Sequence, residues 1–121
     1  MRAATKQDLP VALADDTGVE VRAQEIGGGM TVGFFHLPQG TDLRPALTGL
    51  EDDLCQCPHW GYILAGRLAM HTVDGTEIYE PGQAVYWAPG HAPEALEDTD
   101  YVDFSPTDEI NHVVAHIQGQ G

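Results

Sequence analysis

The first half of the chain alternates apolar and polar positions in short stretches that turn residues separate. Between residues 19 and 26, apolar side chains occupy every second position, which is typical of a strand with one buried face. Three glycines at 27–29 end this stretch, and the more continuously apolar residues 30–37 indicate a second, more buried strand. We therefore expect a pair of strands joined by a glycine turn.

Further strand-like stretches follow at similar spacing. Residues 54–64 fit a strand whose odd positions share one face, and Asp74-Gly75 is the strongest hairpin signal, between stretches 68–73 and 76–79. Two more strands are expected at 84–87 and 101–104, because turn signals such as Pro81-Gly82 and Pro89-Gly90 precede them. So many short strands predict an all-β barrel or sandwich.

The C-terminal region departs from this rhythm. Between residues 107 and 117 two acidic side chains come first, and apolar side chains then recur at the spacing of one helical face: Ile110, Val113, Val114 and Ile117. We expect one short amphipathic helix at about 107–117, after a β core at about 19–105. Residues before about 9 and after 118 show no pattern.

Length and charge narrow the class of protein. A chain of 121 residues with 42% hydrophobic residues suits a single domain, 1–121, with one core. The formal net charge of −14 leaves no basic patch for a phosphate backbone, so nucleic acid and anionic membranes are not expected partners. No apolar run approaches the ~20 residues of a membrane span, and no basic segment precedes an apolar one at the N-terminus. We therefore expect a cytoplasmic protein.

The segment that ends at His59 carries the candidate chemistry. Cys55, Cys57 and His59 occupy alternate positions of one expected strand, so their side chains would share a face. Two cysteines this close in a cytosolic chain indicate metal binding more than a disulfide, since strand geometry places their α-carbons about 6.6 Å apart. The alternative is that the thiols are small buried hydrophobes and His59 satisfies a hydrogen bond in the core.

Spacing restricts which ligands can share one ion. On a flat strand Cys55 and His59 would lie ~13 Å apart, so Cys57 and His59 are the better pair unless a bulge near Pro58 brings Cys55 close. His91, in an irregular Gly/Pro-rich loop, is the first choice for a ligand from elsewhere in the chain. His36 could also face inward. The other histidines are expected at the surface: His71, His112 and His116.

The glycine pattern resembles the two conserved stretches of the cupin superfamily. Gly61 to Gly66, the Asp74-Gly75 hairpin and the Pro81–Gly90 segment carry the likeness, which covers roughly residues 43–105. This resemblance implies an antiparallel jelly-roll barrel, a homodimer, and a divalent metal in the barrel mouth.

The ligand pattern departs from the family's. Cupins commonly use two His and one Glu from the first stretch and one His from the second, and the match puts Asp53, Cys55 and His59 at the first three positions and Pro93 at the fourth. His91 lies two residues before that fourth position. Transfer of the familiar oxygenase or isomerase activities therefore does not follow, although most of these positions still hold coordinating groups.

Three functions follow from these residues. The first is a metal site with Cys57, His59 and His91 as ligands and Cys55 as a fourth ligand or neighbouring thiol; its sulfur and nitrogen donors favour zinc, with iron, nickel or copper as alternatives. Tyr62, Tyr86 and Trp87 are candidates for the wall of a small-molecule cavity. The second is a metal-free barrel that binds a small molecule, and the third, redox sensing by the cysteines, lacks a nearby basic residue that would lower a thiol pKa. No motif identifies catalytic residues.

Overall fold

The computed structural model describes residues 1–119 and consists mainly of strands. Nine strands precede one helix, with three short 3₁₀ turns at Lys6–Asp8, Pro45–Leu47 and Glu51–Asp53. The strands and helix are β1 (Val11–Ala14), β2 (Glu20–Gly27), β3 (Met30–Leu37), β4 (His59–Ala65), β5 (Leu68–Thr72), β6 (Gly75–Tyr79), β7 (Ala84–Trp87), β8 (Ala92–Ala95), β9 (Thr99–Pro106) and α1 (Thr107–Gln118).

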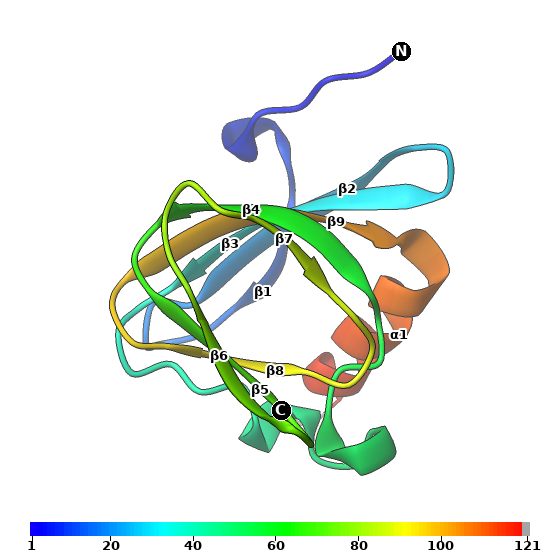
Figure 1. Ribbon diagram of the computed structural model, residues 1–121. Helices are drawn as coiled ribbons and strands as arrows, with labels where there is room; N and C mark the ends of the chain where they lie inside the picture. Colours follow the sequence, from blue (N-terminus) through cyan, green and yellow to red (C-terminus); the bar gives the residue numbers. More distant parts are fainter. Residues whose placement is uncertain (120–121) are drawn as a thin grey trace.

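Two antiparallel sheets curve around a common interior (Figure 1). One sheet has the strand order β1-β2-β3-β9-β4-β7, and the other has the order β6-β5-β8. Because β9 lies between β3 and β4, the end of the strand region is inserted beside its earlier part, as in a jelly roll. The predicted all-β barrel with a short C-terminal helix is confirmed.

The inward positions of the strands form the main core. Residues such as Leu37, Ile63 and Leu68 are fully buried, and the rings of Phe35 and Tyr101 stack 4.6 Å apart across the β3–β9 pair. Burying each large apolar side chain contributes roughly 1.5–3 kcal/mol, so this alternation explains why the strands keep their register.

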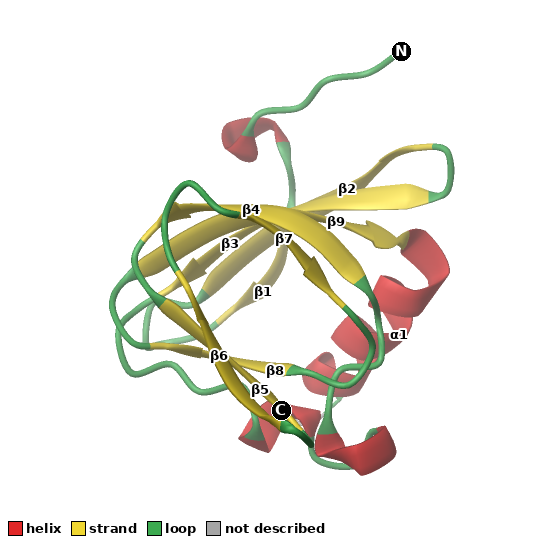
Figure 2. Cartoon of the chain, in the orientation of Figure 1, coloured by secondary structure: helices red, strands yellow, loops and turns green. Residues whose placement is uncertain are grey.

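Helix α1 closes one side of the barrel (Figure 2). Its apolar stripe, which includes Ile110 and Val113, packs against Leu47, Leu54 and Cys57 in the segment before β4. This second core fixes the irregular segment that carries the two cysteines. None of the helices in the described residues has the length and apolar character needed to span a membrane.

Candidate metal centre

Backbone pairing brings two distant segments together at the candidate site. The amide of Cys55 donates a hydrogen bond of 2.8 Å to the carbonyl of His91, and the amide of Gly90 donates one of 2.8 Å to the carbonyl of Cys55. The turn at Gly90 has a φ of +97°, in the left-handed region that glycine adopts without strain. The His91 loop is therefore attached directly to the cysteine segment.

The strand that carries His59 is shorter than the sequence predicted. β4 begins only at His59, and residues 56–58 are irregular because Pro58 has no amide to donate to a ladder. This break lets the chain fold back so that Cys55 Sγ lies 3.6 Å from His59 Nε2. The structure thus has the close approach of Cys55 and His59 that a flat strand would forbid.

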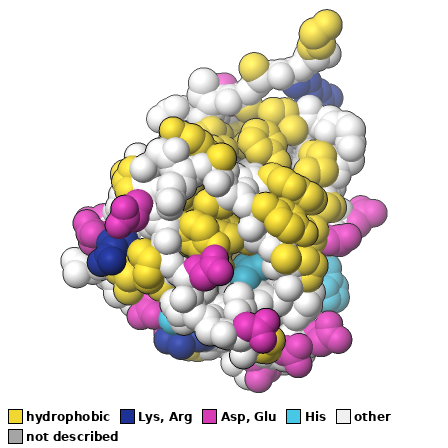
Figure 3. Space-filling view, in the orientation of Figure 1, with side chains coloured by type: hydrophobic (Ala, Val, Ile, Leu, Met, Phe, Trp, Pro, Cys, Tyr) yellow, Lys and Arg dark blue, Asp and Glu magenta, His cyan; other side chains and the backbone are white. Residues whose placement is uncertain are grey.

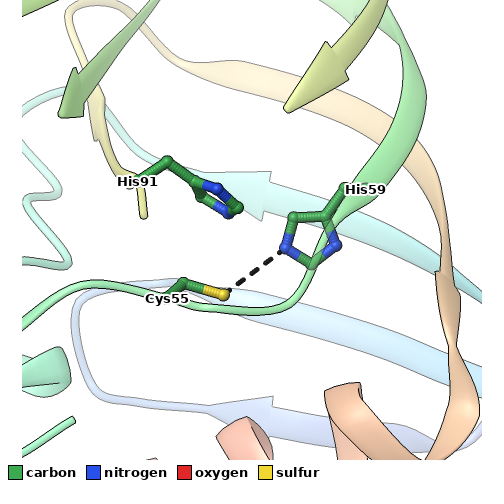
Figure 4. Close-up of side chains that lie close together, drawn as sticks. All are labelled: Cys55, His59 and His91. Atoms are coloured by element: carbon green, nitrogen blue, oxygen red, sulfur yellow. Dashed lines mark hydrogen bonds between the residues drawn. The ribbon is translucent and has the colours of Figure 1, made fainter. Parts of the chain in front are cut away.

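Three side chains converge on one point in the barrel (Figure 4). One donor atom each from Cys55, His59 and His91 lies within 4.8 Å of the others, and all three residues are buried. Donors on a four-coordinate zinc ion lie about 3.3–3.8 Å apart, given bonds of ~2.0–2.3 Å. Side-chain adjustments of about 1 Å would therefore let all three reach one ion.

Hydrogen bonds orient both imidazoles for coordination. His91 Nδ1 lies 2.7 Å from the carbonyl oxygen of Ala88, which can only accept, so Nδ1 carries the proton and Nε2 keeps its lone pair. His59 Nδ1 lies 2.6 Å from Ser105 Oγ and 3.5 Å from an Asp103 carboxylate oxygen. Proteins commonly hold metal-binding histidines through the second ring nitrogen in this way.

Burial keeps all three groups uncharged in the absence of an ion. It raises the pKa of Cys55 to about 11, and it lowers the pKa of His59 to about 3, with the neighbouring His91 adding to the effect. Burial also lowers the pKa of His91. At neutral pH the imidazoles are therefore ready to coordinate, whereas the thiol must lose a proton to an incoming metal ion.

Asp103 and Ser105 are site residues that the sequence reasoning missed. Asp103 is 3% exposed, and its register partners are Gly33 on one side and Gly61 on the other. A Cβ at Gly33 would lie 3.0 Å from Asp103 Oδ1, so the glycine makes room for the carboxyl group. The sequence contains a signal for both residues: Asp103 and Ser105 alternate with Tyr101, which places them on the buried face of the last strand.

Cys57 lies outside the converging group. Its side chain is 1% exposed and packs with α1 and Leu47, and its Sγ lies 3.4 Å from the carbonyl oxygen of Pro58. Burial raises its pKa to about 12, with the neighbouring Cys55 thiol adding to the shift. The structure places it as a buried thiol of the second core.

The three aromatic residues predicted for the cavity wall lie on two different faces. Trp87 is buried and lines the cavity, whereas Tyr62 and Tyr86 are 44% and 55% exposed. The register pairs Tyr86 with Trp60, and their rings lie 5.2 Å apart. Tyr62 and Tyr86 therefore lie on an outer sheet face and do not line the cavity that Trp87 lines, although Tyr86 borders a second pocket together with Trp87 and His91.

The remaining polar candidates have other partners. His36 pairs with Asp100 at 2.8 Å, and His71 Nε2 lies 2.8 Å from Glu94. Asp53, at the first cupin ligand position, accepts a hydrogen bond from the amide of Gly49. Pro93, at the fourth, lines the cavity from β8.

A cavity of about 490 Å³ lies beside the three donors. Cys55, His59 and His91 form part of its wall, and apolar residues from β1, β2 and α1 form much of the remainder. The volume is within the range of pockets that hold small organic molecules, ~300–1,000 Å³. An ion held by these donors would lie at the wall of this cavity.

Solved structures share this architecture at low sequence identity. A cupin superfamily protein from Desulfitobacterium hafniense has a TM-score of 0.59 at 14% identity, covering 85% of this chain and 93% of the other. For an RmlC-like cupin from Shewanella frigidimarina the TM-score is 0.58 at 10% identity, with 85% and 88% covered. KdgF from Halomonas has a TM-score of 0.59 at 17% identity, covering 84% of this chain and 90% of the other. No protein-family model and no curated protein sequence matches the chain. The structural likeness and the jelly-roll topology together show that this chain has the fold of the cupin superfamily.

Proposed function

We propose that this protein binds one divalent transition-metal ion through Cys55, His59 and His91 and a small organic molecule in the adjacent cavity. The observation that carries the proposal is the approach of three buried donor atoms to within 4.8 Å. The second nitrogen of each imidazole is already engaged, and at His91 the carbonyl partner can only accept, so its Nε2 lone pair is available. Both imidazole rings are therefore held in a fixed orientation before an ion binds, as metal-binding histidines commonly are.

Zinc is the ion we expect, with iron, nickel and copper as alternatives. One thiolate and two imidazoles are donors that transition metals prefer over the oxygen donors of calcium and magnesium. Three protein ligands would leave a four-coordinate ion one further position for water or a ligand, as in catalytic rather than structural zinc sites. An ion bound there would act as a Lewis acid toward a ligand group. Ser105 and Asp103 would hold the His59 ring in place.

A metal-free barrel that binds a small molecule is the second candidate. The observation in its favour is the 3.6 Å contact between Cys55 Sγ and His59 Nε2, which pairs these two groups without an ion. In this alternative the thiol donates to the imidazole, and the cavity alone performs the function.

Metal removal distinguishes the two candidates. We expect one ion per chain by elemental analysis after loading with zinc and dialysis. We also expect chelation to lower the melting temperature by about 10 °C, since an ion held at a hundred times its Kd stabilises the fold by about 2.7 kcal/mol. Protein that retains no ion and melts at an unchanged temperature would support the metal-free barrel instead.

We also propose that the protein forms a homodimer through an exposed aromatic face on β4, β7 and β9. Five large apolar residues, all 39–55% exposed, make up this face: Trp60, Tyr62, Leu64, Tyr86 and Phe104. Hydrophobic side chains gather over β4 and β7 in the space-filling view (Figure 3). Contiguous exposed apolar surface of this kind marks interaction sites. A second copy fits it because the face is uncharged, so two chains of net charge −14 repel each other least there.

Introducing a charge into the aromatic face is expected to dissociate the dimer. Light scattering should give twice the chain mass of 13.1 kDa for the native protein and the single-chain mass for Tyr86→Glu. The matched control is Val73→Glu, which places the same charge on a residue that is 74% exposed in the β5–β6 hairpin. A native protein that is monomeric, or a Tyr86→Glu variant that remains dimeric, would contradict this interface.

A further inference from the structure

A second pocket, of about 340 Å³, opens between the β5–β6 hairpin, the β7–β8 loop and the segment before β4. We call it the hairpin pocket, and its chemistry comes from three carboxyl groups and three aromatic rings: Asp52, Asp74, Glu77, Tyr79, Tyr86 and Trp87. The larger cavity beside the metal centre is lined mainly by aliphatic residues. The two pockets therefore suit different ligands.

The carboxyl groups of the hairpin pocket have no cationic partner. Asp52, Asp74 and Glu77 are all exposed, and no lysine or arginine among the described residues lines the pocket. The arginines at positions 22, 44 and 67 pair with acidic side chains elsewhere. In a chain with a net charge of −14, negative charge at this pocket is therefore uncompensated, and it attracts a positively charged group.

The same carboxyl groups are too far apart to share a metal ion. Within residues 1–119, the three residues that bring their donor atoms within 4.8 Å of one another are Cys55, His59 and His91. A bare calcium or magnesium ion needs several oxygen atoms at about 2.0–2.6 Å from its centre. Separated carboxylates around a pocket of this volume instead suit an organic cation, which is larger and carries its charge on a nitrogen atom.

Aromatic rings add a second attraction for such a cation. The rings of Tyr79 and Trp87 meet edge to face, with centroids 5.7 Å apart and planes at 73°. Tyr86, which is 55% exposed, presents a further ring at the border of the pocket. The face of an aromatic ring attracts an ammonium group within about 6 Å of its centroid. Rings and carboxylates therefore favour the same kind of ligand.

Trp87 brings a hydrogen-bond donor without a partner to this pocket. The residue is 3% exposed, and its Nε1 is the buried side-chain nitrogen or oxygen in the described part of the chain that lacks a hydrogen bond. Tyr79 comes near this nitrogen without completing a hydrogen bond, and its own hydroxyl donates to Glu77 at 2.7 Å. Because Tyr79 lines the hairpin pocket and not the larger cavity, the indole N–H faces the hairpin pocket.

A buried donor of this kind needs an acceptor. Nearly all buried polar groups in folded proteins have a hydrogen-bond partner, and leaving one without a partner costs about 1–3 kcal/mol. Tyr79 is only partly buried, so its ring can move to admit an acceptor atom of a ligand to Trp87 Nε1. The ligand would then combine a positive charge with a hydrogen-bond acceptor.

We propose that the hairpin pocket binds an organic ammonium ion that also carries a hydrogen-bond acceptor. The ammonium group lies among the carboxylates and beside the Tyr79 ring, and the acceptor receives the hydrogen bond from Trp87 Nε1. This site goes beyond the proposed metal site and does not depend on it, because none of these contacts involves an ion.

Calorimetric titration with three probes of one shape tests the charge preference. Choline is the cation, 3,3-dimethylbutan-1-ol is its neutral carbon analogue, and 3,3-dimethylbutanoate is the anion. At pH 7 and ~0.15 M salt, we expect choline to bind at least about tenfold more tightly than either other probe, since the carboxylates and rings favour its charge alone. Absence of choline binding, or equal binding of the neutral probe, would overturn the proposal.

The indole N–H signals show whether the acceptor reaches Trp87. The chain has two tryptophans, so a ¹⁵N-labelled sample gives two indole signals, which Trp60→Phe assigns. We expect choline to move the Trp87 signal further than the Trp60 signal, because its hydroxyl oxygen accepts the Trp87 hydrogen bond. Binding of choline with an unmoved Trp87 signal would refute the assignment of the acceptor.

Two charge variants locate the ammonium group. Glu77→Gln removes a charge from the pocket and keeps an oxygen for the Tyr79 hydroxyl, and we expect it to weaken choline binding at least about threefold. Glu25→Gln removes the same charge from an exposed position on β2 outside the pocket and should leave the affinity unchanged. Equal affinities in the two variants would show that choline responds to net charge alone, and would overturn the site.

Discussion

Replacing His59 by alanine is expected to reduce zinc affinity by at least about a hundredfold, because the variant loses one of three ligands and the one at the centre of the hydrogen-bonded group. His59 contacts Cys55 through one ring nitrogen and Ser105 and Asp103 through the other. The substitution therefore removes a donor atom and leaves Ser105 and Asp103 without the ring that they hold in position. Competition against a zinc-binding indicator measures the affinity, and elemental analysis measures the metal retained.

Cys57→Ala is the matched control for this experiment. Cys57 is two residues from both Cys55 and His59 and is equally buried, but its thiol packs in the second core. We expect native zinc affinity with a loss of unfolding free energy of about 1 kcal/mol, as for the removal of a small buried group. Undiminished zinc in His59→Ala would remove that residue from the ligand set, and a large loss in Cys57→Ala would restore the thiol as a ligand.

The sequence predicted most of the strands because their apolar periodicity is local information. The alternation at 19–26, the glycine turn and the Asp74-Gly75 hairpin all correspond to observed elements, and α1 spans Thr107–Gln118 where 107–117 was expected. β1 and β8 were not predicted. β8 contains Pro93 and Glu94, and pairing with β5 on one side and backbone hydrogen bonds to residues 40–43 on the other make it a strand.

The choice among metal ligands could not be made from the sequence, since it depends on tertiary contacts. Cys55, His59 and His91 were all identified as candidates, but spacing along a flat strand favoured Cys57 over Cys55. The Cys55–His91 bridge and the break before His59 reverse that order. The bridge pairs residues more than thirty positions apart, which no local pattern encodes, whereas the break lies at Pro58, where the sequence had left a bulge open.

The outward position of Tyr62 follows from its even position in β4. Once β4 starts at His59, the odd positions His59, Gly61 and Ile63 face inward, and Trp60 and Tyr62 face outward. Tyr86 faces the same side because the register pairs it with Trp60. The predicted strand over 54–64 already placed Tyr62 opposite His59, so the pattern itself argued against Tyr62 in the cavity wall, whereas the face of Tyr86 became known only with the register.

The apparent affinity for zinc is expected to fall about ten- to a hundredfold for each pH unit between 8 and 5, without steepening near pH 6.5. The ion must displace the proton of Cys55, whose pKa is raised to about 11 by burial, so the thiol stays protonated over this whole range when the ion is absent. One displaced proton gives a tenfold change per pH unit. The Asp103 carboxyl group, whose pKa burial also raises, would contribute at most one more.

The histidines determine the shape of this pH profile. Two ordinary imidazoles with pKa values near 6.5 would each add a proton to be displaced below that pH, and the profile would become steeper. Because the pKa of His59 is lowered to about 3 and that of His91 is also lowered, proton competition at these rings begins only at lower pH. Competition titrations at four pH values, corrected for protonation of the indicator, measure the slope, and Cys55→Ala should reduce it by tenfold per unit. A break near pH 6.5 would show that the rings are hydrated rather than buried, and an unchanged slope in Cys55→Ala would show that the thiol does not bind the ion.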